Sequence, residues 1–238
     1  MTLVASLPPL AAYAIGFQTL VYLALPRHLR FAWAPLVTGF MGAVVTAIAG
    51  ITFGFDTVGL GVTDPGTIVA WGLAATFTTA LVGWFMLNSS ALRPALADPR
   101  IGSLDRRQAA QQILIRIPIM TAFIEEAFFR GVLHAALMAF YPPEVALWAG
   151  AGMFGLWHIG PGIDQSQQNG HRKMMATAGT AVTVVATTLA GAGLVWLRME
   201  TGSIWASVAV HASLNMTMAW FSRVASRSDS VAGMHAAP

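Results

Sequence analysis

Apolar residues recur along the chain in seven long runs that short polar segments separate. The runs cover about residues 10–25, 34–53, 67–87, 111–138, 144–158, 174–197 and 203–222. Most of them approach the roughly 20 apolar residues that a helix needs to cross the hydrocarbon core of a bilayer. A chain in lipid must satisfy its backbone hydrogen bonds internally, so each run predicts a transmembrane helix. We therefore expect an all-α fold, a polytopic transmembrane bundle of about seven spans.

Basic residues fall in alternate connections between these runs. Ten of the 13 lie in connections that seven spans would place on one side of the membrane: Arg27, Arg30, Arg93, Arg100, Arg106, Arg107, Arg172, Lys173, Arg223 and Arg227. Arg116 and Arg130 lie within the fourth run, and Arg198 alone lies on the other side. Because connections rich in Lys and Arg stay in the cytoplasm, the pattern predicts an external N-terminus and a cytoplasmic C-terminus.

The composition agrees with an integral membrane protein. Of the 238 residues, 56% are hydrophobic and 10% are charged, whereas soluble domains are about 25% charged. We expect one transmembrane domain over residues 1–222 and a disordered cytoplasmic tail over residues 223–238. The sequence pI of about 10.0 follows from the basic connections and does not indicate nucleic-acid binding. Cysteine is absent, which excludes disulfides, thiolate metal sites and a cysteine nucleophile.

The fourth run contains three ionisable residues in the segment TAFIEEAFFR. Each would cost about 2.5–3.5 kcal/mol at the centre of a membrane helix, so such residues usually carry function. Glu126 and Arg130 are four residues apart and can form an ion pair on one helix face, whereas Glu125 points about 100° away. A buried carboxylate without a cation is the stronger base, so Glu125 is our candidate general base. The alternative is that all three residues only lock a packing contact.

Two later runs each contain a pair of spaced residues. In AGMFGLWHIGPG, Phe154 precedes His158 by one helical turn, and in SVAVHASLNMTMAW, His211 and Asn215 share a face. Each pair has a structural alternative, namely a polar helix end for His158 and an interhelical hydrogen bond for the other two. His134 follows Arg130 by four residues, either as a further partner of the ion pair or as a packed histidine.

Together the segments EEAFFR, FGLWH and HASLN resemble the CAAX prenyl endopeptidase and bacteriocin-processing (abortive-infection) family of intramembrane proteases. The family pattern is Glu-Glu-x-x-x-Arg, Phe-x-x-x-His and His-x-x-x-Asn on successive membrane helices. All three motifs match in order and in separate runs, and they place a catalytic core at about residues 110–222.

The resemblance implies an endopeptidase that needs no cofactor and uses a water molecule activated by a glutamate. Glu125 and His158 would hold and deprotonate the water, and His211 and Asn215 would stabilise the oxyanion. The supporting residues would be Glu126, Arg130 and Phe154. The implied substrate is a peptide or a lipidated protein among membrane lipids, in the plasma membrane of a bacterium or an archaeon. The sequence leaves the oligomeric state open.

Three other functions fit parts of the pattern. Glu125, His158 and His211 could instead bind zinc, which we rank second because the chain lacks an HExxH motif. A protein of this fold could act without proteolysis, as a scaffold or an immunity-type protein. Intramembrane Glu and His residues also form proton relays in transporters, but the sequence shows no inverted repeat.

Overall fold

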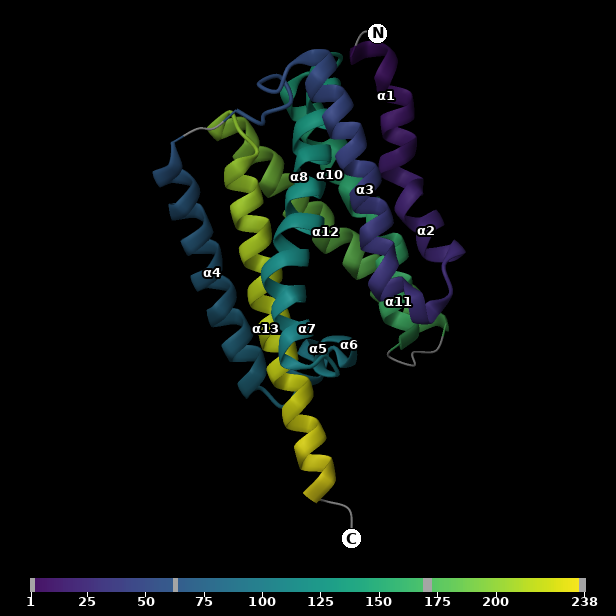
Figure 1. Cartoon of the computed structure of the whole chain (residues 1–238), viewed down its shortest axis with the longest axis vertical. Coiled ribbons are helices and arrows are strands. Elements are labelled where there is room, and N and C mark those ends of the chain that lie inside the picture. Colours follow the sequence, from purple (N-terminus) through teal and green to yellow (C-terminus); the bar gives the residue numbers. More distant parts are fainter. Residues whose placement is uncertain (1–2, 62–63, 169–172, 236–238) are drawn as a thin grey trace. The chain divides into compact units, whose positions relative to one another are not determined.

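The computed structural model describes residues 3–61, 64–168 and 173–235, and within these ranges the regular structure is entirely helical (Figure 1). The all-α prediction is therefore confirmed. The elements in chain order are α1 (Leu3–Ala12), η1 (Tyr13–Phe17), α2 (Gln18–Ala24), α3 (Arg27–Phe53), α4 (Pro65–Asn88), α5 (Arg93–Leu96), α6 (Pro99–Gly102), α7 (Arg106–Gln111), η2 (Gln112–Phe123), α8 (Ile124–Glu126), η3 (Ala127–Leu133), α9 (His134–Met138), α10 (Pro143–Trp157), α11 (Ile159–Gln168), α12 (Lys173–Thr201) and α13 (Trp205–His235). The η elements are π-helical.

The chain forms two compact units, each built from two stretches of sequence. The first unit comprises Met1–Thr63 and Ile124–Ser207, and the second comprises Asp64–Phe123 and Val208–Pro238. The expected single transmembrane domain over residues 1–222 stays a prediction.

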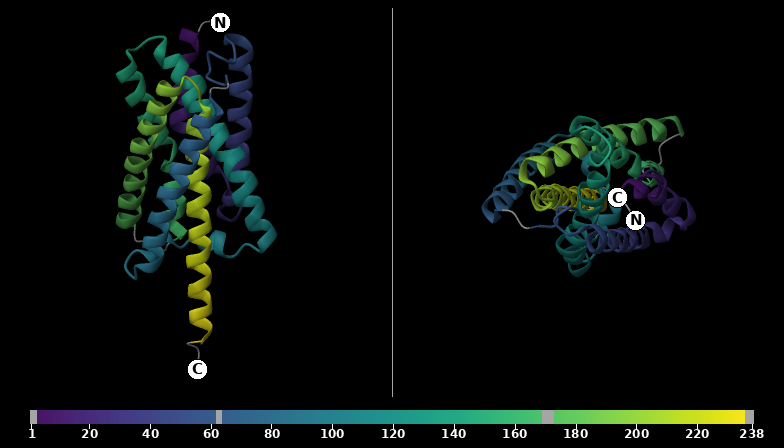
Figure 2. Two further views of the ribbon diagram at one scale, coloured as in Figure 1. Left: turned by 90° about the vertical axis from the view of Figure 1, so that its left-hand side faces the viewer. Right: turned by 90° about the horizontal axis from the view of Figure 1, so that it is seen from above.

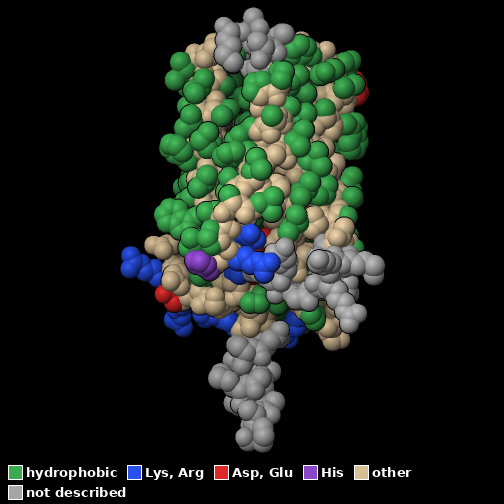
Figure 3. Space-filling view, turned by 90° about the vertical axis from the view of Figure 1, so that its right-hand side faces the viewer, with side chains coloured by type: hydrophobic (Ala, Val, Ile, Leu, Met, Phe, Trp, Pro, Cys, Tyr) green, Lys and Arg blue, Asp and Glu red, His purple; other side chains and the backbone are tan. Residues whose placement is uncertain are grey.

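Four helices in the described part of the chain are long and apolar enough to cross a membrane. They are Leu7–Ala24, Arg27–Phe53, Pro65–Asn88 and Thr177–Thr201. Large apolar side chains such as Phe40 on α3 and Phe77 on α4 are exposed, as expected for helices that face lipid. Hydrophobic side chains also cover much of the face in Figure 3, with Lys and Arg gathered towards the end where α2 joins α3. The protein is thus an integral membrane protein.

The other three predicted runs are also helical, but the count of seven spans is not confirmed. The fourth run contains the π-helical elements η2 and η3 as well as charged residues. The fifth corresponds to α10, which has 15 residues and is followed directly by the polar helix α11. The seventh lies within α13, which continues as a helix to His235, past residue 222 where the sequence predicted that a disordered tail begins.

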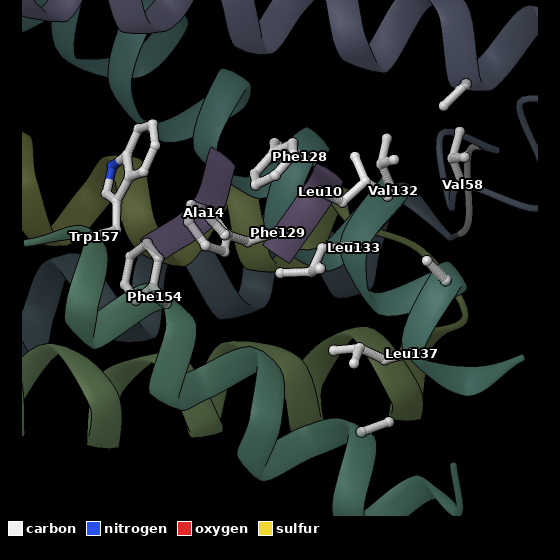
Figure 4. Packing of buried hydrophobic residues seen from close by; sticks show 13 residues of the cluster. Leu10, Ala14, Val58, Phe128, Phe129, Val132, Leu133, Leu137, Phe154 and Trp157 are labelled. Carbon is white, nitrogen blue, oxygen red and sulfur yellow. The ribbon is translucent and has the colours of Figure 1, made fainter. Parts of the chain in front are cut away.

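The core of the first unit combines aliphatic and aromatic side chains, several of them from the motif helix, by which we mean α8, η3 and α9 together (Figure 4). Phe129 of η3 makes edge contacts with Phe154 and Trp157 of α10, at ring-centroid distances of 5.1 and 5.5 Å. Phe128 contacts Tyr13 of η1 at 4.8 Å. Such edge-to-face pairs have specific geometry and fix side-chain directions. The core therefore holds η3, α10 and η1 in a defined register.

Glycines allow α10 and α12 to pack closely. A Cβ atom at Gly155 would collide with the Thr188 hydroxyl and come within 2.7 Å of the Val184 carbonyl oxygen. A Cβ atom at Gly191 would lie 3.0 Å from the Phe154 ring. Small residues at such contacts bring membrane helices together through van der Waals packing. Both glycines lie within a few residues of motif residues in sequence or space.

In the second unit, α4 runs alongside α13 (Figures 1 and 2). A Cβ atom at Gly83 would come within 2.5 Å of the Phe221 ring, so this glycine permits the close packing. Beyond the span predicted for this helix, Arg223 of α13 donates hydrogen bonds to the carbonyl oxygens of Ile101 and Leu104 at 3.0 and 2.8 Å. These bonds tie the continuation of α13 to the α6 region and account for the helix extending past residue 222.

Candidate active site

The two adjacent glutamates lie on the short α-helical element α8, between the π-helical elements η2 and η3. The sequence predicted that this run is helical, without indicating the π-helical turns. Pro118 lies inside η2, and because proline lacks a backbone N–H it disturbs the regular α-helical hydrogen-bond ladder. π-helical stretches often occur at functional sites. The motif therefore lies where the helix backbone departs from regular geometry.

The predicted ion pair between Glu126 and Arg130 is present. The Arg130 Nη1 atom lies 3.0 Å from Glu126 Oε1, and both side chains are completely buried. Arg130 Nη2 also donates to the Gly191 carbonyl oxygen of α12 at 3.2 Å. The guanidinium carbon lies 4.1 Å from the centre of the Phe154 ring, a cation–π contact. The arginine thus ties together the motif helix, α10 and α12.

Glu125 lies in different surroundings. Its Oε1 atom accepts a hydrogen bond from Trp157 Nε1 at 3.2 Å, and its buried Oε2 atom has no hydrogen-bond partner among the described residues. Trp157 is itself held by ring contacts with Tyr13 and Phe129 at 5.4 and 5.5 Å. One carboxylate oxygen is therefore fixed by the protein, and the other has unused capacity to accept a hydrogen bond.

Our sequence reasoning missed Trp157. The available signal was its indole N–H, a donor without acceptor capacity that must find a partner when it is buried in an apolar helix. Trp157 also immediately precedes His158 in the second motif.

His158 lies at the C-terminal end of α10, as its position in the fifth run predicted, with α11 following directly. Its Nδ1 atom is 2.8 Å from the Phe154 carbonyl oxygen. Because a carbonyl oxygen can only accept, this contact places a proton on Nδ1, and Nε2 is then the nitrogen that can act as a base when the ring is neutral. The imidazole also meets the Phe154 ring edge-on, at a centroid distance of 4.7 Å.

Phe154 therefore connects two motifs within the first unit. Its ring contacts the Arg130 guanidinium and the His158 imidazole, while its carbonyl oxygen sets the tautomer of His158. The Phe-x-x-x-His spacing makes both contacts with His158 possible because residues four apart are neighbours on a helix. A smaller side chain at this position would remove the ring that contacts both the Arg130 guanidinium and the His158 imidazole.

His211 and Asn215 belong to the second unit, where they lie four residues apart on α13. This spacing places both side chains on one face, one turn apart. An imidazole and an amide can each donate a hydrogen bond to an oxyanion. The first unit contains the other five predicted residues.

His134 makes no hydrogen bond to the Glu126–Arg130 pair. It is 6% exposed, and its Nδ1 atom has no hydrogen-bond partner among the described residues. It lines a pocket together with Thr57 and Arg198. Of the two expectations for this residue, a partner of the ion pair and a packed histidine, the structure supports the second.

Residues 109–217 match the family model of the type II CAAX prenyl endopeptidases, described as Rce1-like. The matched segment contains all three motifs, from Glu125 to Asn215. This segment of the chain is thus similar to the type II CAAX prenyl endopeptidases. No curated protein and no solved structure matches the chain.

Proposed function

We propose that the protein is an intramembrane endopeptidase that hydrolyses a peptide bond of a membrane-associated substrate with a water molecule activated by Glu125. The observation that carries this proposal is the difference between the two glutamates. Glu126 is neutralised by Arg130, whereas Glu125 has one oxygen held by Trp157 and one buried oxygen with no hydrogen-bond partner among the described residues. A fixed carboxylate with an available oxygen can accept a proton from water.

The proposed reaction needs no covalent enzyme intermediate. Glu125 takes a proton from the water, and the resulting hydroxide adds to the carbonyl carbon of the substrate. His158 helps to hold the water through Nε2, and His211 and Asn215 donate to the oxyanion that forms. When the carbon–nitrogen bond breaks, the proton on Glu125 passes to the leaving nitrogen. The products are a carboxylic acid and an amine, which accounts for both hydrogen atoms of the water.

The substrate that we propose is a peptide or a lipidated protein that reaches the site from the surrounding lipid. The charge pattern of the connections favours an external N-terminus and a cytoplasmic C-terminus, in the plasma membrane of a bacterium or an archaeon. Reporter fusions after residues 60, 105, 165 and 230 should then report outside, inside, inside and inside. An external signal at residue 105 or 230 would overturn this orientation.

The test of the proposed function compares membrane peptides from cells that express the wild type with those from cells that express Glu125→Gln at equal levels. C-terminal fragments that require Glu125 should disappear in the variant, and the purified wild type should cleave a synthetic peptide that spans the same site. If both proteins give identical fragments and neither cleaves the peptide, the proteolytic function is wrong and a non-proteolytic role takes its place.

The same cleavage assay tests whether the site works without a metal ion. We expect turnover to be unchanged by a membrane-permeant chelator. Stoichiometric zinc in the purified protein, together with turnover that is lost on chelation and regained on adding Zn²⁺, would establish the metalloprotease mechanism instead.

A further inference from the structure

One pocket in the first unit contains the polar side chains of Arg198 and His134 and is not explained by the proposed peptidase chemistry. It has a volume of about 520 Å³ and is lined by Thr57, His134, Ala135, Met138, Ala139, Arg198 and Met199. These residues come from the end of α9, the end of α12 and the connection that follows α3. A pocket of this size falls within the range of small-ligand sites, about 300–1,000 Å³.

The arginine of this pocket is held in place by the backbone of the connection. Gly59 has a φ angle of 71°, and a Cβ atom there would collide with the Arg198 guanidinium. The absence of a side chain thus creates the space in which the guanidinium lies. Glycine is also the residue that adopts positive φ at least cost. The Arg198 guanidinium therefore packs against Gly59, which restricts its movement.

The connection itself is anchored on two sides. The Gly59 carbonyl oxygen accepts hydrogen bonds from Ile204 N at 2.9 Å and from Ser203 Oγ at 3.3 Å. On the other side, Val58 is fully buried, and a Cβ atom at Gly131 of η3 would lie 2.7 Å from the Val58 carbonyl oxygen. The pocket wall is therefore preformed, which lowers the entropic cost of binding a ligand.

The polar groups of the pocket lack partners within the protein. Arg198 makes neither an ion pair nor a hydrogen bond with any residue in the described ranges, and its Nε atom is buried without a partner. The Nδ1 atom of His134, a side chain that is 94% buried, is likewise unpartnered in the described part of the chain. Buried polar groups normally have hydrogen-bond partners. Arg198 and His134 also line the same pocket, and a guanidinium and an imidazole can each donate to a ligand that accepts hydrogen bonds.

The C-terminal ends of helices lie close to Arg198. Three helices end at this pocket or next to it, namely α3, α9 and α12, and the C-terminal ends of helices stabilise cations. This effect explains why an arginine is tolerated here, but it leaves the guanidinium donors without acceptors. The ligand must therefore supply negatively charged oxygens.

Residues at the rim of the pocket indicate where this ligand would lie relative to the membrane. Met138 and Met199 line the pocket and are exposed, and the exposed aromatic residues Phe140 and Tyr141 directly follow this part of the motif helix. Tyrosine and tryptophan concentrate where the hydrocarbon of a bilayer meets the headgroups. A pocket at the boundary between hydrocarbon and headgroups, with a basic centre and an apolar rim, suits a charged group that is attached to a hydrocarbon chain.

We propose that this pocket binds a phosphate group, with the Arg198 guanidinium, the His134 imidazole and the Thr57 hydroxyl as donors. The planar guanidinium can bind two phosphate oxygens at once. The phosphate comes from the headgroup of an anionic phospholipid, whose acyl chains lie along Met138 and Met199, or from a free phosphate ion. The site is separate from the motif residues, so the binding does not depend on the proposed peptidase activity.

The experiment measures ligand-induced thermal stabilisation of the full-length protein in a neutral detergent. The probes are phosphatidylglycerol, phosphatidylcholine and inorganic phosphate, each titrated to saturation. The variants are Arg198→Gln, Arg198→Lys and Thr57→Val, and the control is Arg107→Gln, which removes one exposed positive charge from the second unit. Native mass spectrometry of the same samples counts the bound lipids.

We expect phosphatidylglycerol to stabilise the wild type in a saturable way, with one lipid bound, and Arg198→Gln to weaken its binding by about tenfold or more. Arg198→Lys and Thr57→Val should weaken it less, and Arg107→Gln should leave it unchanged. Saturable stabilisation by inorganic phosphate that also requires Arg198 would assign the site to free phosphate. If every probe acts equally on the wild type and on Arg198→Gln, or if Arg107→Gln weakens binding as much, the proposed phosphate site is wrong.

Discussion

Glu125 and Glu126 are adjacent in the sequence, yet the regions around them differ in almost every respect. Glu126 is completely buried against a cation that contacts two further elements. Glu125 faces a neutral indole and keeps one oxygen without a hydrogen-bond partner in the described structure. The charge of Glu126 is compensated by an ion pair, whereas the carboxylate of Glu125 has no cation bonded to it in the described structure. The difference supports the proposed roles, in which Glu126 stabilises the fold and Glu125 acts as the base.

The largest expected effect is the loss of activity in Glu125→Gln. Removing a general base typically lowers the rate by about a hundred- to ten-thousandfold, and we expect kcat/KM for peptide cleavage to fall within this range. The Tm in detergent should change little, because glutamine can still accept the hydrogen bond from Trp157. An active Glu125→Gln variant would remove Glu125 from the chemistry.

Glu126→Gln should mainly lower stability, whereas Glu125→Gln should mainly lower activity. It leaves the guanidinium of Arg130 buried without its counter-charge, which costs about 3–5 kcal/mol of stability. The measurement is the thermal or denaturant midpoint of the purified variant in detergent.

The control for this prediction removes both charges. The double variant Glu126→Leu/Arg130→Met should recover much of the lost stability, because replacing a buried ion pair by apolar groups is often nearly neutral. If Glu125→Gln and Glu126→Gln destabilise the protein equally, the two glutamates do not have the separate roles assigned here.

Asn215 extends the comparison to the second unit. As an oxyanion donor, it should act mainly in the transition state, so Asn215→Ala should lower kcat by about a hundred- to a thousandfold and leave KM nearly unchanged. Asn88→Ala, at the end of α4, serves as the control and should retain full activity. A rise in KM with unchanged kcat would instead place Asn215 in substrate binding.

A smaller effect is expected when Trp157 loses only its N–H group. Trp157→Phe keeps an aromatic ring in the core but removes the donor to Glu125, and we expect activity to fall about tenfold, at the lower end of the cost of a hydrogen bond to a charged group. Trp148→Phe changes an exposed tryptophan of the same helix and should have no effect. Equal activities of the two variants would show that Glu125 does not need the indole.

The smallest effect concerns Asp64, an exposed carboxylate that serves as a reference for the two glutamates. Hydrogen bonds from Thr67 and from the backbone at the start of α4 hold the pKa of Asp64 below its ordinary value. Its stabilising contribution is therefore present above the unfolded-state pKa and is lost as the pH falls through the lower folded-state pKa. Asp64→Asn should show slightly less loss of Tm on acidification than the wild type, and an identical pH profile would contradict this.

The sequence predicted contacts that depend on spacing along one helix. The pairing of Glu126 with Arg130 and the contact of Phe154 with His158 follow from residues four apart on the same face. The all-helical fold followed equally from the length of the apolar runs, because lipid leaves the backbone few alternatives.

Contacts between elements could not be predicted in the same way. The hydrogen bond from Trp157 to Glu125 and the ion pair between Arg30 and Asp164, at 3.2 Å, join residues far apart in the sequence, and many other partners were possible. The π-helical turns around Ile124–Glu126 also escaped prediction, because they depend on how the surrounding elements pack. The division into two units reflects tertiary contacts that no local pattern specifies.

The short helix α10 has a consequence for the lipid around the site. At about 1.5 Å per residue, its 15 residues extend over about 22 Å, less than the roughly 30 Å hydrocarbon thickness of a bilayer. If α10 spans the membrane, local thinning of the bilayer is one way to match its exposed residues Val145 and Trp148 to the apolar layer. Because the helix ends next to His158, such thinning would bring the headgroups and their water closer to the depth of Glu125. The length of one helix would thereby set how far water must travel through hydrocarbon to reach a buried peptide bond.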